Sequence, residues 1–422
     1  MTALDLSLPA TTARPADPPV SLAAVAALLA GLNGPQRRAV THADGPLLVV
    51  AGPGTGKTRV ISRRIAWLIA TKRARPAEIL ALTFTERAAS EMQARVDVLV
   101  PYGHNDSAIH TFHAFGDRLV REHAFRLGLP DDPRLVTRAE AVVLLREHLF
   151  ELGLDHFRPL GDPTRFLGAL AALFGRAKEE GIEPGAYAAH AADLLRAAEA
   201  VGTGPAGEAA RAEADVQAEL ARAYGAYQAL LGGRGRLDFG DQVLLALRLL
   251  REAPDVRAAV QRRFRYILVD EFQDTDGAQL ELLTLLAGPH GNVTAVGDDD
   301  QSIYRFRGAA LGNVLGFAER FTGARTIVLR RNHRSRRPIL EAAYRLIRHN
   351  DPARLEARIG LDKRPVAVRR ARAGAVECHA FGRVEEEADW IAGQVAERLA
   401  RGGRPRDIGI LVRTNADARP IL

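Results

Sequence analysis

Short apolar runs alternate with helical stretches along the first part of the chain. The β-like runs Leu47–Val50 and Ile79–Thr83 stand before and after a stretch with helical spacing, 58–71. Short buried strands that alternate with helices are typical of βαβ units and predict a parallel sheet. Strand-like runs return later, each followed by a polar or acidic turn, at Tyr266–Val269, Val293–Val296 and Thr326–Leu329. The pattern therefore predicts an α/β fold whose parallel sheet is interrupted and then resumes.

The interruption is predicted to be a helical insertion. It is rich in Ala, Leu, Arg and Glu, and Thr137 with Glu140 forms a capping-box pattern ahead of an apolar helix. A second α/β unit is predicted near the end, with strands Glu377–Phe381 and Ile408–Val412 around a helix at 385–401. The expected organisation is a loose tail at 1–20, a first domain in two parts at 21–115 and 235–322, the helical insertion at 116–234, and the second unit at 323–422.

Composition narrows the class of protein. The chain has 422 residues, of which 47% are hydrophobic and 26% charged, as in globular proteins with several domains. The apolar run Leu22–Ala30 is too short to span a bilayer and lacks a basic flank, so we expect neither a targeting segment nor a membrane span. The single cysteine, Cys378, allows no internal disulfide and no cysteine-based metal site, which fits a cytoplasmic protein.

The charge distribution favours a polyanionic partner. The net charge is +7, and the last hundred residues, 323–422, hold 22 basic and 12 acidic side chains. Such asymmetry is typical of nucleic-acid binding. The alternative is that arginine serves as the general surface cation, because the only lysines are Lys57, Lys72, Lys178 and Lys363.

The first chemical signal is AGPGTGKT, at 51–58, between an apolar strand and an amphipathic helix. This context is the one a phosphate-binding P-loop requires, although Ala51 stands where many P-loops have glycine. Lys57 is expected to reach the outer phosphates of a nucleotide and Thr58 to ligate Mg²⁺. Backbone N–H groups would surround the phosphates along the loop formed by Gly52, Pro53, Gly54, Thr55 and Gly56. The alternative is a plain glycine-rich turn.

The second signal is YILVDEFQDT, at 266–275, a buried strand that ends in two acids. Asp270 is expected to hold Mg²⁺ opposite Thr58, and Glu271 to polarise an attacking water molecule. An isolated Asp-Glu pair is more often a surface cap, but a hydrophobic strand leading into it, in a chain with a P-loop, favours catalysis. Together the two signals predict a nucleoside triphosphatase that uses Mg²⁺.

Several further motifs, in order along the chain, resemble the UvrD, PcrA and Rep group of superfamily 1 DNA helicases. LNGPQRRAV resembles the group's Q motif, which implies that Gln36 reads the adenine edge; a glutamine on a helix is otherwise solvated surface. LTFTERAASEM and TFHAFG resemble two segments that touch single-stranded DNA, and LDFGDQV resembles the return from the helical insertion. The resemblance implies DNA contacts by Thr83, Phe84, Thr85, Thr111, Phe112 and His113.

The most specific match is GDDDQSIYRFRGA, at 297–309. The resemblance implies that Gln301 senses the γ-phosphate and that Tyr304, Phe306 and Arg307 lie along the DNA strand. Stacking of a base on an aromatic ring is worth about 1 to 3 kcal/mol for any base, so the assignment is physically coherent. The alternative is that the two aromatic side chains belong to the core.

LRRNHRS, at 329–335, resembles the motif at the start of the group's second RecA-like domain. The resemblance implies that Arg334 is an arginine finger, that His333 stacks on adenine and that Arg59 contacts the nucleotide. The alternative for the arginines is a solvated basic face. Three positions depart from the group: Phe306 replaces Trp, His333 replaces Tyr and Glu86 replaces Asn. We expect these changes to alter DNA affinity without abolishing function.

The resemblance implies two RecA-like domains, the first with a helical insertion and the second only begun. ILVRTNADARPIL, at 410–422, resembles a strand and turn of that second domain, so the group's last two motifs, with a second γ-phosphate arginine, are expected to be missing. The implied function is an ATP-dependent translocase that moves 3′-to-5′ on single-stranded DNA and unwinds duplex at junctions, with repair or recombination proteins as partners. The alternatives are a nucleotide-dependent single-strand binding module and the motor part of a helicase-nuclease.

Overall fold

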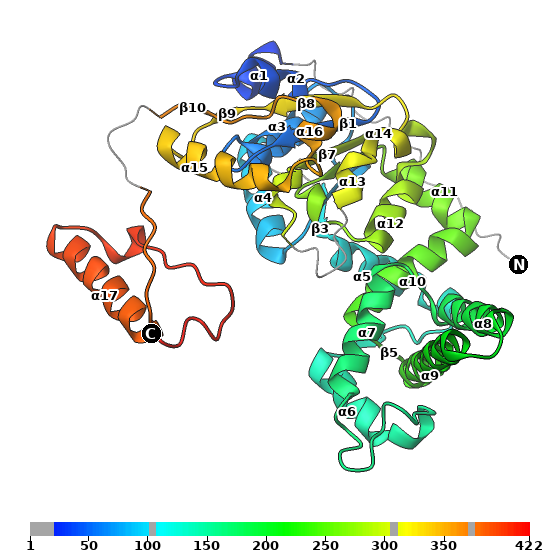
Figure 1. The fold of residues 1–422 in the computed structure, drawn as a ribbon. Helices are drawn as coiled ribbons and strands as arrows, with labels where there is room; N and C mark the ends of the chain where they lie inside the picture. Colours follow the sequence, from blue (N-terminus) through cyan, green and yellow to red (C-terminus); the bar gives the residue numbers. More distant parts are fainter. Residues whose placement is uncertain (1–20, 101–106, 304–310, 370–375) are drawn as a thin grey trace, which may run out of the picture.

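The computed structural model describes residues 21–100, 107–303, 311–369 and 376–422. Its centre is a sheet of six parallel strands in the order β3-β2-β6-β7-β1-β8 (Figure 1). The strands are β1 Leu47–Ala51, β2 Ile79–Thr83, β3 Ala108–Thr111, β6 Tyr266–Val269, β7 Val293–Gly297 and β8 Arg325–Leu329. The predicted parallel sheet is confirmed, and its strands come from both sides of the helical interruption.

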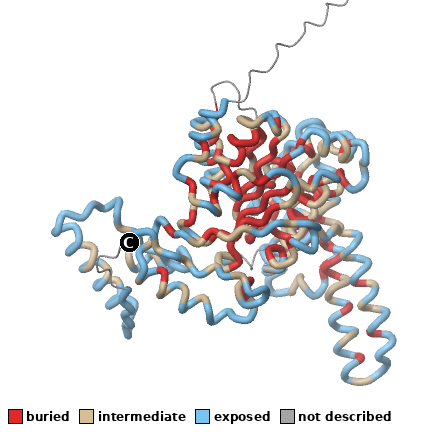
Figure 2. Tube along the Cα trace, turned by 90° about the horizontal axis from the view of Figure 1, so that it is seen from above, coloured by how far each residue is buried: buried red, intermediate tan, exposed pale blue. Residues whose placement is uncertain are grey.

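The sheet is buried on both faces, as the continuous apolar runs require. Successive residues of a strand point to opposite faces, so Leu48 and Val50 join one hydrophobic cluster while Leu47 and Val49 join the other. The buried core runs through the middle of the molecule (Figure 2). Helices that supply residues to one cluster are α1 Leu22–Leu29, α2 Gly34–Val40, α3 Lys57–Ala70 and α4 Glu86–Leu99. Those that supply the other include α5 Phe112–Glu122, α10 Phe239–Glu252, α11 Pro254–Arg263, α12 Gly277–Ala287, α13 Leu311–Leu315 and α14 Phe317–Arg320.

The helical insertion has a core of its own and projects away from the sheet (Figure 1). Its helices are α6 Arg138–Glu147, α7 Leu167–Glu179, α8 Pro184–Val201 and α9 Pro205–Gly232. Two short paired strands, β4 Arg134–Leu135 and β5 Arg236–Leu237, lie before and after these helices. Helix α5, in contrast, packs in a cluster of the sheet domain, although we expected the insertion to begin at residue 116, inside this helix. The first helix after β3 therefore supports the sheet.

The chain after β8 forms smaller elements. They are β9 Arg331–Asn332, α15 Arg337–Ile347, α16 Leu355–Ile359, β10 Val366–Ala367 and α17 Val384–Ala400, and β10 pairs with β9. Although we expected the second unit to begin at residue 323, β8 pairs with β1 over its whole length, so the first sheet continues beyond that position.

The predicted helix at 385–401 is confirmed as α17, but the two strands predicted around it are wrong. Residues 377–381 and 408–412 have no regular secondary structure. A strand needs a neighbouring strand to receive its backbone hydrogen bonds, and neither segment pairs with another among the described residues. Alternating apolar residues alone therefore did not determine a strand. No helix in the described part of the chain is both long and apolar enough to cross a bilayer.

Candidate nucleotide site

The glycine-rich loop lies between β1 and α3, as predicted. Gly54 and Gly56 have φ angles of 75° and 95°, in the left-handed region that glycine adopts without strain. A Cβ atom at Gly54 would come within 2.5 Å of the Arg334 Cβ, so the loop passes very close to the chain after β8. No side chain caps the N-terminus of α3, and Thr55 turns inward to donate to the Gly52 carbonyl at 2.6 Å. The first N–H groups of α3 are therefore available to bind an anion.

Three of the predicted catalytic side chains meet at this loop. The Lys57 ammonium forms an ion pair with Glu271 and lies 3.4 Å from the Gln301 Oε1 atom. Lys57 is only 9% exposed. Parallel strands β1, β6 and β7 bring these residues together, because the turns after their carboxyl ends lie at one edge of the sheet.

The acid pair begins where β6 ends. Asp270 donates its backbone N–H to the Leu82 carbonyl of the neighbouring strand at 2.9 Å, and its side chain accepts from the Glu271 N–H at 3.0 Å. Burial, together with the charge of Glu271, raises the pKa of Asp270 to about 6. Glu271 itself has a φ of 49°, a conformation that residues other than glycine rarely adopt. Strained backbone of this kind collects at functional sites, where the surrounding structure holds it in place.

The residues present fit a magnesium ion held mainly by a substrate. The described residues contain no group of three or more His, Cys, Asp or Glu side chains that could bind a metal by themselves. Mg²⁺ usually takes one or two protein oxygen ligands and completes its shell with water and phosphate oxygens. The Asp270 carboxylate and the Thr58 hydroxyl are ligands of this type, and Thr58 stands next to Lys57 at the start of α3.

Gln273 links these groups, and the sequence analysis missed it. Its Nε2 atom donates to Glu271 at 2.9 Å, and its Oε1 atom accepts from the Asp298 backbone N–H at 3.0 Å. Asp298 in turn accepts from the Gln301 Nε2 atom at 2.8 Å. Lys57, Glu271, Gln273, Asp298 and Gln301 thus form a closed ring of contacts. The only sequence signal for Gln273 is its place three residues after Asp270.

Asn332 was also missed, although it lies inside the quoted LRRNHRS run. It is 2% exposed, its Nδ2 atom donates to the Pro53 carbonyl at 2.5 Å, and its Oδ1 atom accepts from the Arg334 backbone N–H at 2.9 Å. The His333 N–H also donates to the Gly54 carbonyl at 2.8 Å. Hydrogen bonds therefore connect the chain after β8 to the phosphate loop, and they position Arg334 and His333 beside that loop.

Gln36 lies on the far side of the same loop. Its Nε2 atom donates to the Thr55 carbonyl at 2.9 Å, and its Oε1 atom accepts from the Asn33 N–H at 3.1 Å. The side chain is 1% exposed, so both ends of its amide are engaged with the protein. The solvated-surface interpretation of Gln36 is therefore wrong, because this side chain supports the backbone of the loop.

A cavity of about 530 Å³ brings together most of the predicted nucleotide-site residues, but Gln36, Gly52, Thr55 and Asp270 do not line it. A volume of this size suits a small-molecule ligand. The cavity is lined by Pro53, Gly54, Gly56, Lys57, Thr58, Arg59, Glu271, Gln301, His333 and Arg334, with Glu91, Arg95 and Arg369 beside them. The last three were not predicted, and both arginines add positive charge that suits a phosphate-bearing ligand.

The residues expected to touch DNA lie around the carboxyl ends of β2 and β3. Thr85 caps α4, and the Thr111 hydroxyl caps α5 while donating to Glu86 at 2.8 Å. His113 stands edge-on to Phe239, with ring centroids 6.2 Å apart. Phe239 is 56% exposed and belongs to the quoted LDFGDQV run, but no role was predicted for it.

Some of the expected DNA contacts are not accessible in this structure. Phe112 is 3% exposed and packs in the hydrophobic core, because the apolar face of α5 that includes Phe115 points to the sheet. Thr83 is 1% exposed, and Phe84 is half-buried. Tyr304, Phe306 and Arg307 lie outside the described residues.

The parallel sheet carries a glycine-rich loop with a buried lysine after β1, and an acid pair after β6, which is separated from β1 by β7. These features define a P-loop nucleoside triphosphatase of the RecA-like type. The profile of the UvrD/REP helicase N-terminal domain matches residues 32–322, and that of the UvrD-like helicase C-terminal domain matches residues 327–422. The chain therefore belongs to the UvrD-like family of superfamily 1 helicases.

Curated relatives agree with this placement. The ATP-dependent DNA helicase PcrA of Bacillus subtilis (strain 168) is 36% identical over 395 residues, which cover 93% of this chain and 49% of the relative. PcrA of Leuconostoc citreum is 34% identical over 402 residues, with 94% and 49% covered. The chain thus spans about half the length of the curated relatives it matches.

Proposed function

We propose that this chain is the ATP-hydrolysing part of a DNA helicase and uses ATP hydrolysis to move along single-stranded DNA. The observation that carries the proposal is the contact of Lys57 with Glu271 and Gln301 inside a cavity that also presents Arg334. Lys57, Glu271 and Gln301 follow strands β1, β6 and β7, and Arg334 lies in the chain after β8. A nucleotide bound between them would therefore connect the sheet domain with the chain after β8.

In this proposal each side chain has one task. Lys57 and the N-terminus of α3 bind the outer phosphates, and Gln301 senses the γ-phosphate. Glu271 accepts the proton of the attacking water, and Arg334 stabilises the charge that develops during phosphoryl transfer. Thr58 and Asp270 would hold Mg²⁺, which supplies charge neutralisation when bound.

Adenine recognition is proposed for a different part of the cavity. His333 and Arg59 line it and offer an aromatic face and a cation. Gln36 supports this part through its hydrogen bond to Thr55, and it would have to leave that carbonyl to read the adenine edge. We therefore assign Gln36 first to holding the loop and second to the base.

We propose that single-stranded DNA runs over the carboxyl ends of β2 and β3, on Phe84, Thr85 and His113, with Phe239 as a further aromatic contact. Exposed aromatic rings suit this task, because stacking binds bases of any identity. We leave the buried Thr83, Thr111 and Phe112 out of the contact set. We further propose movement in the 3′-to-5′ direction, unwinding at junctions, a role in repair or recombination and a cytoplasmic location, because the chain resembles the UvrD group in its motifs.

Replacing Glu271 by Gln tests the catalytic assignment. The variant keeps the shape of the side chain but loses its basicity, so we expect DNA-stimulated phosphate release to fall at least about 100-fold. Affinity for a non-hydrolysable ATP analogue should change by less than about threefold. Glu281→Gln, on the exposed face of α12, is the matched control.

Wild-type hydrolysis by the Glu271→Gln variant would contradict the assignment. A wild-type chain that binds ATP and DNA without turnover would instead favour the single-strand binding module. Hydrolysis by a longer natural form that also cleaves DNA would identify the motor part of a helicase-nuclease.

A further inference from the structure

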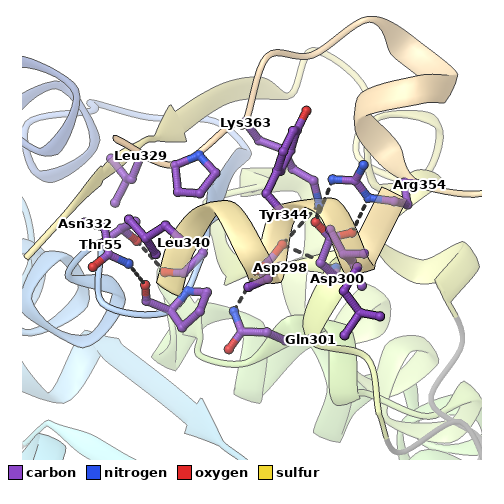
Figure 3. Close-up of a pocket in the computed structure, with 16 residues that line it drawn as sticks. Thr55, Asp298, Asp300, Gln301, Leu329, Asn332, Leu340, Tyr344, Arg354 and Lys363 are labelled. Carbon is purple, nitrogen blue, oxygen red and sulfur yellow. Dashed lines mark hydrogen bonds and ion pairs between the residues drawn. The ribbon is translucent and has the colours of Figure 1, made fainter. Parts of the chain in front are cut away.

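Three consecutive aspartates, Asp298, Asp299 and Asp300, lie between β7 and Gln301; we call them the acidic turn. Lys363, from the segment before β10, contacts all three. Its Nζ atom lies 3.2 Å from Asp298 Oδ1, 2.5 Å from Asp299 Oδ1 and 2.7 Å from Asp300 Oδ2. Asp298, Asp300 and Lys363 line a cavity of about 290 Å³, together with Thr55 of the phosphate loop (Figure 3).

A second cation completes the cluster. Arg354 lies 2.7 and 2.9 Å from the two Asp300 carboxylate oxygens, and the Leu355 N–H donates to Asp299 at 2.8 Å. The side chains of Arg354 and Lys363 are only 4% and 6% exposed. Buried carboxylates are stable only when they are paired and hydrogen-bonded, so the acidic turn depends on residues 354–363 for its charge balance. Burial lowers the pKa of Lys363, but the neighbouring aspartates outweigh burial and the pKa is raised.

Asp298 connects this cluster to the nucleotide site. One of its oxygens, Oδ1, faces Lys363, and the other, Oδ2, accepts from the Gln301 Nε2 atom at 2.8 Å. The opposite end of the same amide, Oε1, faces Lys57 at 3.4 Å. The amide nitrogen has two donor hydrogens, and one of them is held by Asp298. The oxygen end of the amide faces Lys57, where phosphates are expected, so the amide has to turn away from Asp298 for its nitrogen to donate to a phosphate there.

The charge on Asp298 therefore controls how easily Gln301 turns. A full, unpaired carboxylate holds an amide N–H more strongly than one shared with an ammonium. The Lys363 ammonium, 3.2 Å from Asp298, partly neutralises the charge of this carboxylate. Neither Lys363 nor Asp298 lines the cavity of about 530 Å³ that holds Lys57, so the effect on the nucleotide passes through Gln301.

We propose that Lys363 is a positioning residue that neutralises Asp298 and so leaves the Gln301 amide free to turn toward the third phosphate of the nucleotide. The proposal rests on the proposed function, because it assumes that Gln301 senses that phosphate. It predicts that the preference for a triphosphate over a diphosphate depends on a lysine that never touches the nucleotide.

The test measures equilibrium binding of ATPγS and of ADP, each with Mg²⁺, to the 422-residue chain by titration calorimetry. Lys363→Met should lower the ratio of ATPγS to ADP affinity about tenfold, the size expected of one hydrogen bond to a charged group. The ADP affinity should stay within about twofold, because ADP lacks the phosphate that Gln301 would contact. Lys363→Arg should keep the ratio, and Lys72→Met, at an exposed turn, is the matched control.

A second comparison remains informative when Lys363→Met folds poorly. Asp298→Asn removes the charge that Lys363 balances, so Asp298→Asn and Asp298→Asn/Lys363→Met should have the same ratio within about twofold. A merely structural Lys363 would instead lower both affinities together in either background.

The outcomes separate the two proposals. A wild-type chain that binds neither nucleotide overturns the proposed function, and this inference with it. A wild-type chain that prefers ATPγS, and keeps that preference in Lys363→Met, overturns the inference alone. Equal wild-type affinity for the two nucleotides also overturns it, because nothing then senses the third phosphate.

Discussion

Three of the four lysines in this arginine-rich chain lie buried against carboxylates. Lys57 pairs with Glu271, Lys178 with Asp238 and Asp241, and Lys363 with the acidic turn. A compact ammonium can approach several carboxylate oxygens at once, as Lys363 does with the three aspartates of the acidic turn. In a chain that otherwise uses arginine as its cation, a lysine therefore marks a buried charge pair.

The departure at Glu86 gives a prediction for DNA affinity. Glu86 accepts from Thr111 beside the proposed DNA path, and its negative charge opposes a phosphate backbone. We expect Glu86→Asn to raise the affinity for single-stranded DNA about threefold to tenfold at low salt, with a smaller difference at high salt. Fluorescence anisotropy with a labelled oligonucleotide measures this change. Glu252→Gln, exposed at the far end of α10, is the control, and equal affinity of Glu86→Asn and wild type would exclude Glu86 from the path.

Asp276 gives a prediction for the pH dependence of stability. It caps α12 by accepting from the Gln279 N–H at 2.8 Å, and burial, with help from Glu179 and Glu180, raises its pKa to about 7. Between the pKa of Asp276 in the unfolded state and about pH 7, the folded state keeps the carboxyl proton that the unfolded state has lost. The free energy of unfolding therefore falls as the pH rises through this range. Asparagine caps equally well and carries no charge. We therefore expect Asp276→Asn to gain about 2 kcal/mol of unfolding free energy at pH 8.5 and less than half of that at pH 5.

Urea unfolding at the two pH values measures the Asp276→Asn effect, with the exposed Asp131→Asn as control. An equal gain at both pH values would show that ionisation of Asp276 is not its cause.

Individual site residues were predictable where a local pattern forces their position. The P-loop and the strand that ends in Asp270 and Glu271 are such patterns, because β1 and β6 bring them to one sheet edge in any fold of this type. Gln273 and Asn332 were not predictable, because their roles come from hydrogen bonds to residues 25 and 279 positions away. The burial and hydrogen bonding of the Gln36 side chain were not predictable either, because they depend on a tertiary contact with Thr55.

At the scale of elements, five predicted strands and the capping box of α6 are confirmed. Both kinds of signal are local or nearly so: a run of apolar residues long enough for a buried strand, and two side chains three residues apart. The strands expected at 377–381 and 408–412 are wrong because strand formation depends on a partner that no local pattern supplies.

The junction between the insertion and the sheet domain gives a prediction at this scale. Lys178 of α7 is completely buried and lies 2.8 Å from both Asp238 and Asp241 at the start of α10, and Tyr227 of α9 also donates to Asp238. Lys178→Met would leave two buried carboxylates without their cation. We expect a loss of about 3 to 5 kcal/mol in unfolding free energy.

Urea denaturation followed by circular dichroism measures the Lys178→Met effect, with Lys72→Met as the exposed control. A loss below about 1 kcal/mol would show that the junction does not depend on this ion pair.

At the scale of the whole molecule, the sequence predicted a sheet domain with a helical insertion, and both appear in the structure (Figure 1). It also predicted a second α/β unit at 323–422, of which the two strands around α17 are wrong. The contacts between these parts could not be predicted. Asn332 in the chain after β8 donates a hydrogen bond to Pro53 of the phosphate loop, and Lys363 and Arg354 balance the negative charge of the acidic turn. Both sets of contacts pair residues from separate segments, and such pairing leaves no periodic signal in the sequence.

These contacts make the nucleotide cavity the place where the parts of the molecule meet. The central claim is that ATP hydrolysis at this cavity, begun by phosphate binding at Lys57, drives movement on DNA. The most direct test is ATP hydrolysis by the 422-residue chain with and without single-stranded DNA, beside a Lys57→Ala variant whose circular dichroism matches the wild type. The account predicts DNA-stimulated hydrolysis that falls at least about 100-fold in the variant. Equal DNA-stimulated hydrolysis by the wild type and Lys57→Ala would contradict it.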